Sequence, residues 1–508
     1  MPIVNSLFTW FMKKRMHQIE LFVKYPHDVQ EEVFQNLITA AAQTEWGEKY
    51  EYNSILNYDI FKERVPVQNY DTLKPYIERM LTGEQNILWP TEVNWFAKSS
   101  GTTSDRSKFI PVSKESLEEC HYKGGKDLLS IYCHNRPEAQ IFSGKSLALG
   151  GSHQVNRLKN DINCGDLSAV LIKNLPLWAE FYRTPDMSIT LMENYEEKIQ
   201  KMAEATMSVN VTSISGVPTW TVVLAKKILE ISGANNLLEV WPNLELYIHG
   251  AVNFNPYREQ FKKLIPLASM YYLETYNASE GFFGIQDREN SEEMLLMLDY
   301  GIFYEFIPME FIEDENPKTV NLGDVELDKN YAIVISTNGG LWRYMIGDTV
   351  KFTSLSPYRI QITGRTKHFI NAFGEEVIID NAEKALTTAC AETGASIRDY
   401  TACPVYFADN EAGSHEWIIE FEHQPESFER FTDILDSTLR EVNSDYDAKR
   451  FKDMALRRPL VHIAPNGTFY KWMKNRGKLG GQHKVPRLAN ERKYVEEILG
   501  MMETKAHS

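Results

Sequence analysis

The chain has 508 residues, of which 43% are apolar and 24% charged, and its formal net charge is −16. This composition is typical of a globular protein with a large buried core and room for two or three domains. The negative charge opposes non-specific nucleic-acid binding, which needs a basic surface. No apolar run reaches the roughly 20 residues that cross a bilayer, so we expect a cytoplasmic protein with no nucleic-acid or membrane partner. The five cysteines form no Cys-x-x-Cys pair, which argues against a disulfide framework or a cysteine zinc site.

The first ninety residues are expected to be mostly helical. In MPIVNSLFTWFMKKRMHQIE the cations follow a short apolar run and no small-residue cleavage site is present, so an amphipathic helix is favoured over a signal peptide. The stretch HDVQEEVFQNLITAAAQTEWG carries apolar residues at helical spacing and predicts a helix that stops at Gly47.

From about residue 90 onward, short apolar strands alternate with helices. The strand candidates are WFAKS, SLALGG, SVNVTSISG, LELYIHG, YYLETYN and YAIVIST, and the helix candidates between them are TWTVVLAKKILEIS and NPYREQFKKLI. This alternation predicts an α/β layered fold of mixed sheets and helices, in which ligands bind where loops converge at strand ends.

The pattern changes near residue 365. After TKHFINAFGEEVIIDNAEKALTTACAETG come two strand-like runs, DYTACPVYFAD and HEWIIEFEH, and a long helical pattern, ESFERFTDILDSTLREVNSDYD. Two strands with two or three helices make a plausible α+β unit of about 140 residues. We therefore predict a large N-terminal domain over 1–364 and a smaller C-terminal domain over 365–508, with the boundary at Gly364–Lys367.

The segment Ser99–Lys108 holds six hydroxyl side chains, Gly101 and two cations, Arg106 and Lys108. Its strand-like flanks, WFAKS and FIPVS, place it inside a folded domain and argue against a flexible linker. A P-loop needs Gly-x4-Gly-Lys-[Ser/Thr] followed by a helix, and this spacing is absent. Two interpretations remain: an inert surface loop, or a turn that binds phosphate through hydroxyls, backbone N–H groups and a lysine.

Three further stretches favour the nucleotide interpretation. ETYNASEGFFGIQ places Ser279 and Glu280 after a strand, where a carboxylate can hold Mg²⁺ beside a triphosphate. STNGGLWRYMIGDTVKF places Asp348 where it can accept hydrogen bonds from ribose hydroxyls, and ITGRTKHFINAFGEEV places Arg365 and Lys367 at the domain boundary. Each stretch alone has an ordinary alternative: a turn at a helix start, a hairpin turn, and a solvated charged face. Their order along one chain predicts a shared site.

These motifs resemble those of the auxin-responsive acyl-acid amido synthetases, the Gretchen Hagen family, and within it the bacterial members. SSGTTSDRSK is similar to the family's phosphate loop, YNASEG to its Tyr-x-x-Ser-Glu motif, and WRYMIGD to its Arg-Tyr-x-x-Gly-Asp motif. SGVPTW, YIHGAVNFNPYR, FYEFIP and GGQHKVPRL support the resemblance, which covers roughly residues 20 to 500. The family belongs to the adenylate-forming superfamily, together with firefly luciferase.

The resemblance implies an ATP- and Mg²⁺-dependent ligase that converts a carboxylic acid to an acyl-adenylate and passes the acyl group to an amine, for which an amino acid is the expected donor. The alternatives are acyl transfer to coenzyme A, or a non-catalytic nucleotide-binding protein. The implied roles are phosphate binding by Ser99, Ser100, Gly101, Thr102 and Thr103 with Lys108 nearby; adenine contacts from Gly250, Ala251, Tyr276 and Phe303; Mg²⁺ binding by Glu280 beside Ser279; ribose binding by Asp348 with Arg365; and catalysis of adenylation by a mobile Lys484.

Two features stay open within this resemblance. Asp105 stands where the phosphate loop commonly has a second glycine, and Gly250-Ala251 replaces a commoner Gly-Gly pair.

The acyl pocket is not readable from the sequence, because the candidate aromatic residues are equally compatible with a core; these are Trp178, Phe181, Tyr182, Trp220 and Phe254. Rotation about Arg365–Lys367 would bring Lys484 to the site and withdraw it again.

Overall fold

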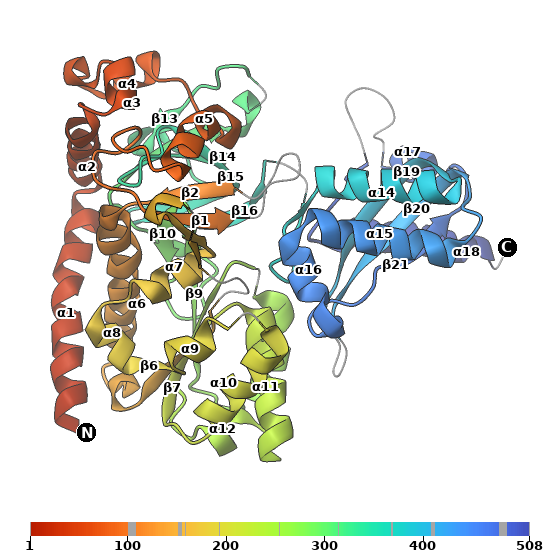
Figure 1. Ribbon diagram of the computed structural model, residues 1–508, viewed down its shortest axis with the longest axis horizontal. Helices are drawn as coiled ribbons and strands as arrows, with labels where there is room; N and C mark the ends of the chain where they lie inside the picture. Colours follow the sequence, from red (N-terminus) through yellow and green to blue (C-terminus); the bar gives the residue numbers. More distant parts are fainter. Residues whose placement is uncertain are drawn as a thin grey trace.

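The computed structural model describes residues 2–99, 108–150, 155–157, 159–192, 194–252, 254–312, 314–366, 369–407, 412–476 and 485–506. Within these ranges no helix combines the length and the apolar character that spanning a bilayer requires. Figure 1 shows a large unit that contains the N-terminus and a smaller unit beside it that contains the C-terminus.

The N-terminal region is helical, as predicted. Its helices are α1 (Pro2–Lys24), α2 (Pro26–Ala41), α3 (Glu45–Lys49), α4 (Tyr58–Arg64) and α5 (Tyr70–Leu81). The predicted end of α2 at Gly47 is wrong, because the helix ends at Ala41 and the Thr44 hydroxyl caps α3 by accepting from Gly47 N at 3.0 Å. Gly47 lies inside α3, where a Cβ would approach the Ala41 carbonyl oxygen to 2.0 Å. The glycine therefore permits close packing and does not stop the helix.

One large sheet organises the N-terminal unit, in the strand order β13-β12-β14-β15-β16-β11-β10-β9-β8-β7-β3-β6. The strands from β6 to β9 pair in parallel, whereas those from β9 to β13 pair antiparallel. The strands are β3 (Lys145–Ala148), β6 (Arg183–Thr184), β7 (Val211–Ser215), β8 (Leu246–Gly250), β9 (Tyr271–Ala278), β10 (Gly281–Ile285), β11 (Met294–Leu296), β12 (Ile302–Pro308), β13 (Val320–Asn321), β14 (Asn330–Thr337), β15 (Tyr344–Leu355) and β16 (Tyr358–Arg365).

A second sheet and further helices complete the large unit. The sheet has the order β2-β1-β5-β4, formed by β1 (Trp95–Ser99), β2 (Lys108–Val112), β4 (Asn156–Arg157) and β5 (Asn163–Gly165). The remaining helices are the π-helical turn η2 (Ser116–His121), α6 (Tyr122–Asn135), α7 (Leu167–Lys173), α8 (Leu177–Tyr182), α9 (Met187–Thr190), α10 (Tyr195–Thr206), α11 (Pro218–Ser232), α12 (Leu237–Val240) and α13 (Arg258–Leu264). The fold confirms the predicted class of mixed sheets and helices.

The C-terminal unit is a three-layer sandwich around the sheet β19-β20-β21. Alternate residues explain the layers: Tyr400 and Ala402 of β19 pack in the core with α14 and α15, whereas Cys403 faces α17 and α18. Its elements are β17 (Phe369–Ile370), β18 (Val377–Ile378), α14 (Ile379–Thr393), β19 (Ser396–Val405), β20 (Ser414–His423), α15 (Phe428–Val442), α16 (Ser444–Arg450), β21 (Leu460–Ala464), α17 (Thr468–Asn475) and α18 (Lys493–Ala506). The sequence did not predict β21, whose residues are mostly half-buried and show no clear alternation.

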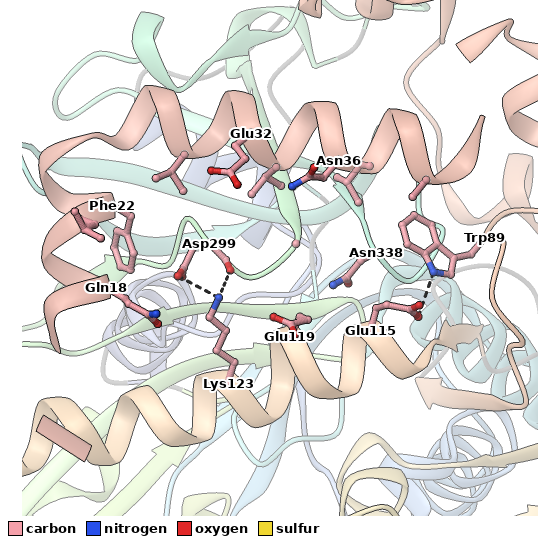
Figure 2. Close-up of a pocket in the computed structure, with 16 residues that line it drawn as sticks. Gln18, Phe22, Glu32, Asn36, Trp89, Glu115, Glu119, Lys123, Asp299 and Asn338 are labelled. Atoms are coloured by element: carbon pink, nitrogen blue, oxygen red, sulfur yellow. Dashed lines mark hydrogen bonds and ion pairs between the residues drawn. The ribbon is translucent and has the colours of Figure 1, made fainter. Parts of the chain in front are cut away.

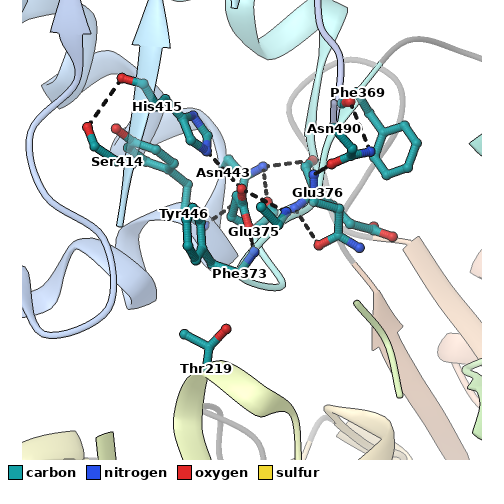
Figure 3. A network of polar contacts seen from close by, with 12 residues as sticks. Thr219, Phe369, Phe373, Glu375, Glu376, Ser414, His415, Asn443, Tyr446 and Asn490 are labelled. Carbon is teal, nitrogen blue, oxygen red and sulfur yellow. Dashed lines mark hydrogen bonds and ion pairs between the residues drawn. The ribbon is translucent and has the colours of Figure 1, made fainter. Parts of the chain in front are cut away.

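The segment that follows β16 contacts both units. Figure 3 shows the buried Glu375, whose carboxylate accepts from Phe373 N at 2.7 Å and is hydrogen-bonded to His415 Nε2 at 2.8 Å. Asn443 donates to the Glu375 carbonyl oxygen at 2.9 Å. From the large unit, Tyr257 OH donates to the carbonyl oxygen of Ala372 at 2.6 Å. This polar network fixes the backbone of the segment at the junction of the two units.

Candidate active site

A cleft of about 1070 Å³ lies where the parallel half of the large sheet meets its antiparallel half. Its walls come from the ends of β1 and β2, from β9, from the turn after β9, and from β15 and β16. The C-terminal unit closes one side with residues that include Asn371, Glu376 and Asn490. Segments far apart in the sequence therefore share one cavity, as the motif pattern predicts.

Asp348 is held by two neighbours inside this cleft. Tyr276 OH donates to Asp348 Oδ2 at 2.6 Å, and Arg365 Nε donates to Oδ1 at 2.7 Å. The register of β15 against β16 pairs Asp348 directly with Arg365, and Gly347 adopts a φ of +100° that favours glycine. Burial raises the pKa of Tyr276, so the phenol stays a donor. Both carboxylate oxygens keep lone pairs for further donors, such as the hydroxyls of a ribose.

Arg365 also joins the two units. Its second contact is an ion pair with Glu376 at 2.6 Å, and its guanidinium lies 5.0 Å from the centre of the Phe369 ring. Burial disfavours the charge, but the carboxylates of Glu376 and Asp348 outweigh that effect and raise the pKa of Arg365. The guanidinium therefore stays charged at the junction between β16 and the C-terminal unit.

Glu280 lies in the two-residue turn of the β9–β10 hairpin, because Ala278 pairs with Gly281. The residue lines the cleft, and burial raises the pKa of its carboxyl, against the opposing effect of the Lys108 cation. A desolvated carboxylate beside an open cavity fits a magnesium ion, which is commonly held by one or two carboxylates plus phosphate oxygens. In the described part of the chain no group of three or more His, Cys, Asp or Glu side chains forms a metal cage. Among the described residues, Glu280 is the carboxylate at the hairpin turn with which a metal ion in the cleft could be held.

The strands on either side of the hydroxyl-rich segment pair with each other beside the cleft. Ser99, at the end of β1, pairs with Lys108, at the start of β2, and both residues line the cavity. Lys108 is buried, and its ammonium lies 5.8 Å from the centre of the Tyr70 ring. The remaining predicted phosphate-binding residues lie outside the described ranges, as does Lys484; they are Ser100, Gly101, Thr102 and Thr103. Pro486 and Leu488, shortly after Lys484 in the chain, line the cleft.

The predicted adenine contacts divide into two groups. Ala251 and Tyr276 line the cleft, and Gly250 ends β8 beside them, where a Cβ would approach the Thr275 carbonyl oxygen to 2.4 Å. Phe303 does not reach the cleft. It is buried in the core, with its ring 5.0 Å from that of Phe34 on α2. The predicted adenine contact of Phe303 is therefore not supported by this geometry, because none of the residues of β12 lines the cleft.

Several cleft residues were not predicted. Glu274 lies two residues before Tyr276 on β9 and lines the same cavity, as the two-residue period of a strand requires. Burial raises its pKa to about 7. His249 stacks on Phe254 with ring centres 4.1 Å apart, and burial lowers its pKa to about 3, so it is neutral. The alternation in YYLETYN was the available signal for Glu274.

The aromatic residues that were candidates for the acyl pocket differ in whether they reach the cleft. Phe254 lines the cleft. Trp220 is buried beside Lys449 of the C-terminal unit, whose ammonium lies 4.3 Å from the indole centre. Phe181 is exposed, and Tyr182 packs against Phe142. Phe254 is therefore the best supported of these candidates.

Comparison with known proteins follows the same segments. The GH3 family N-terminal domain matches residues 15–270, its central domain residues 295–365 and its C-terminal domain residues 380–493. The chain belongs to the GH3 family. This confirms the family that the sequence motifs predicted.

Two curated relatives and one solved structure resemble the chain over most of its length. The indole-3-acetic acid-amido synthetase GH3.3 of Arabidopsis thaliana is 24% identical over 96% of this chain and 93% of its own. The 4-substituted benzoates-glutamate ligase GH3.12 of the same plant is 23% identical over 92% of this chain and 94% of its own. The structure of the GH3.15 acyl acid amido synthetase superimposes with a TM-score of 0.62, at 17% identity, over 96% of each chain. The last comparison establishes the fold.

Proposed function

We propose that this GH3 chain is an ATP-dependent acyl-acid amido synthetase that activates a carboxylic acid as its adenylate and couples it to the amine of an amino acid. The enzyme class, a ligase that forms an acid–amine bond, agrees with the activities for which its GH3 relatives are named. Those activities favour an amine over coenzyme A as the acceptor. We infer the use of ATP and Mg²⁺, and the roles of individual residues, from the cleft.

One observation carries the proposal: the cleft brings together groups suited to each part of Mg-ATP. Lys108 and Ser99 stand at one wall, Glu280 at the hairpin turn, and Asp348 with Arg365 at the end of β16. A cation, a desolvated carboxylate and a hydrogen-bonded aspartate match a polyphosphate, its metal and a ribose. The cavity volume, about 1070 Å³, slightly exceeds the roughly 300–1,000 Å³ that is usual for a small-molecule site, which leaves room for both a nucleotide and an acid.

The first half-reaction needs this concentration of charge. A carboxylate oxygen of the acid attacks the α-phosphorus of ATP, the bond to the bridging oxygen breaks, and pyrophosphate leaves. Two anions must approach each other, so catalysis depends on positioned cations. Lys108 would supply one cation, and Lys484 a second. Mg²⁺ held by Glu280 would neutralise negative charge on the phosphates.

The second half-reaction transfers the acyl group. The amine nitrogen attacks the acyl carbon, the bond to the AMP oxygen breaks, and AMP leaves with that oxygen while the nitrogen loses a proton. We propose that the C-terminal unit, 365–508, rotates about Arg365–Lys367 between the half-reactions, which would bring Lys484 in and then make room for the amine. The contacts of Tyr257 with Ala372 and of Arg365 with Glu376 would change in that rotation.

The relatives and the cleft wall support a proposal for the substrate class. GH3.3 and GH3.12 are named for indole-3-acetic acid and for 4-substituted benzoates with glutamate. The cleft contains apolar and aromatic groups, among them Val252, Phe254 and Tyr272. We therefore propose an aryl or arylalkyl carboxylic acid as the acyl donor and an α-amino acid as the acceptor.

A pyrophosphate-release screen tests the function. Purified protein with Mg-ATP is offered a panel of aryl and alkyl carboxylic acids, first alone and then with pooled amino acids or with coenzyme A. Acid-dependent pyrophosphate release, with an amide product only in the amino-acid arm, is the expected result. A thioester in the coenzyme A arm would replace the proposed acceptor. ATP binding without acid-dependent pyrophosphate release across the panel would favour a non-catalytic nucleotide-binding protein.

A further inference from the structure

A second cavity, of about 510 Å³, lies on the side of the large unit formed by α1, α2 and α6. We name it the α2–α6 groove. Figure 2 shows α2 along one side, carrying Glu32 and Asn36, and the η2–α6 helix along the other, carrying Glu115, Glu119 and Lys123. In Figure 1 these helices lie on the side of the large unit away from the C-terminal unit. The groove shares no lining residue with the candidate active site.

The floor of the groove is apolar. Phe22, Leu37 and Trp89 are buried and line it, and the half-buried Val33 faces it from α2. Trp89 is held in place because its indole N–H donates to Glu115 Oε2 at 3.3 Å. A concave apolar surface with a few polar groups is the usual form of a small-molecule site.

The charged groups around this floor are mostly acidic. Glu32, Glu115 and Glu119 line the groove, and none has an ion-pair partner in the described part of the chain. Among the described residues that line the groove, Lys123 is the only cation, and Asp299 already engages it: the Lys123 ammonium lies 3.1 Å from Asp299 Oδ2 and donates to the Asp299 carbonyl oxygen at 2.6 Å. The groove therefore carries an excess of negative charge.

A buried acceptor at the groove lacks a donor. Asn338 is 6% exposed, and its Oδ1 has no hydrogen-bond partner among the described residues. Its backbone is fixed, since Asn338 N donates to Gly301 O at 3.0 Å and Ser113 Oγ donates to Asn338 O at 2.6 Å. Figure 2 shows Asn338 in the groove between Asp299 and Glu115. A buried, unpaired amide oxygen is unfavourable unless a ligand or water donates to it.

We propose that the α2–α6 groove is a second binding site, for a small molecule that carries a protonated amine on an apolar body. The ammonium would meet the surrounding carboxylates, and rotation of the buried Asn338 amide would turn its unpaired Oδ1 toward it, while the body would cover the apolar floor between α2 and Trp89. A neutral molecule of the same shape would cover the apolar floor but would leave the negative charge of the carboxylates uncompensated. An anion would be repelled by the excess of carboxylates.

The groove is connected to the candidate active site by one helical segment. Cys120 Sγ accepts from Phe282 N at 3.2 Å, and His121 Nδ1 lies 3.1 Å from Asn277 Oδ1. Phe282 and Asn277 belong to the β9–β10 hairpin that carries Glu280. The helical segment that contacts them, η2, is π-helical, a geometry common at functional sites. A ligand in the groove would contact η2 on one side, and η2 would pass a displacement to the hairpin and change turnover; this consequence, unlike the binding itself, rests on the proposed function.

Binding is tested without turnover. Calorimetric titration of the full-length protein, with no ATP present, compares 2-phenylethylammonium with the neutral 2-phenylethanol. We expect the amine to bind at least about tenfold more tightly than the alcohol. Val33→Trp, which fills the groove from α2, should abolish amine binding, and Asn338→Leu should weaken it by about tenfold. Glu32→Gln with Glu119→Gln, two exposed substitutions, should weaken it by a few fold without affecting folding.

The controls separate this site from the cleft. Asp348→Asn should leave amine binding unchanged, and a crystal soaked with the amine should show it beside Asn338. Equal affinities for amine and alcohol, binding that survives Val33→Trp in a folded variant, no binding at all, or an amine found only in the cleft would each overturn the proposal. Pyrophosphate release then reports coupling: a change on adding the amine that Val33→Trp removes would support it, and no change in a protein that binds the amine would refute the coupling alone.

Discussion

Replacement of Glu280 by glutamine changes only the charge of a residue in the β9–β10 turn. The side chain keeps its size and one carbonyl oxygen, so the hairpin between Ala278 and Gly281 should fold as before. The neighbouring Asp348 is already engaged, because its two carboxylate oxygens accept hydrogen bonds from Tyr276 and Arg365. The variant therefore isolates the charge that we assign to Mg²⁺ binding.

The expected loss is large. Removing one well-placed group that stabilises transition-state charge lowers turnover by about 10²–10³-fold, or about 2.7–4 kcal/mol. Stability should change in the opposite direction. Burial raises the pKa of Glu280, so its ionised form destabilises the ligand-free protein at neutral pH, and this penalty disappears as the pH falls below that pKa. Glu280→Gln should therefore raise the melting temperature at pH 8, and the difference from the natural protein should shrink in acid.

The assay measures pyrophosphate release at saturating acid and ATP over a range of Mg²⁺ concentrations, with melting followed by fluorescence at several pH values. Glu280→Gln should lose turnover at every Mg²⁺ concentration. A variant whose kcat stays within threefold of the natural protein at saturating Mg²⁺ would refute the assignment of Glu280. An unchanged or lower melting temperature at pH 8 would show that the buried charge is compensated.

Three further predictions address other parts of the cleft. Asp348→Asn replaces a charged acceptor by a neutral one, so the KM for ATP should rise about tenfold or more, and the preference for ATP over 2′-deoxy-ATP should shrink; an unchanged preference would argue against ribose binding. Lys484→Ala should lower acid-dependent pyrophosphate release by about 10²–10³-fold but leave amide formation from a synthetic acyl-adenylate nearly intact, and equal losses in both assays would contradict a role confined to adenylation. Gly250→Ala places a Cβ 2.4 Å from the Thr275 carbonyl oxygen and should destabilise the protein by about 1–3 kcal/mol, measured by urea unfolding; a stability equal to that of the natural protein would show that β8 can shift away from β9.

The sequence indicated best that its polar motifs share one site. Ser99 ends β1, Glu280 lies in the turn between β9 and β10, and Asp348 lies within β15; all three line one cleft. The family resemblance added the roles, because no local pattern says which carboxylate faces a metal and which faces a ribose.

Features that depend on tertiary packing were not predictable. Phe303 lies in an apolar strand whose two faces are both buried, and the apolar run alone does not show that β12 lies away from the cleft. Gly47 looks like a helix stop, but its role depends on the approach of Ala41. The α2–α6 groove arises only when helices far apart in the chain pack together, so Asn338 and Glu119 give no shared signal in the sequence.

The position of bound nucleotide tests the central claim most directly. We predict that a crystal structure with Mg²⁺ and a non-hydrolysable ATP analogue will place the triphosphate between Lys108 and Glu280, with the ribose hydroxyls on Asp348. A nucleotide bound elsewhere, or one whose phosphates point away from Lys108 and Glu280, would contradict the account.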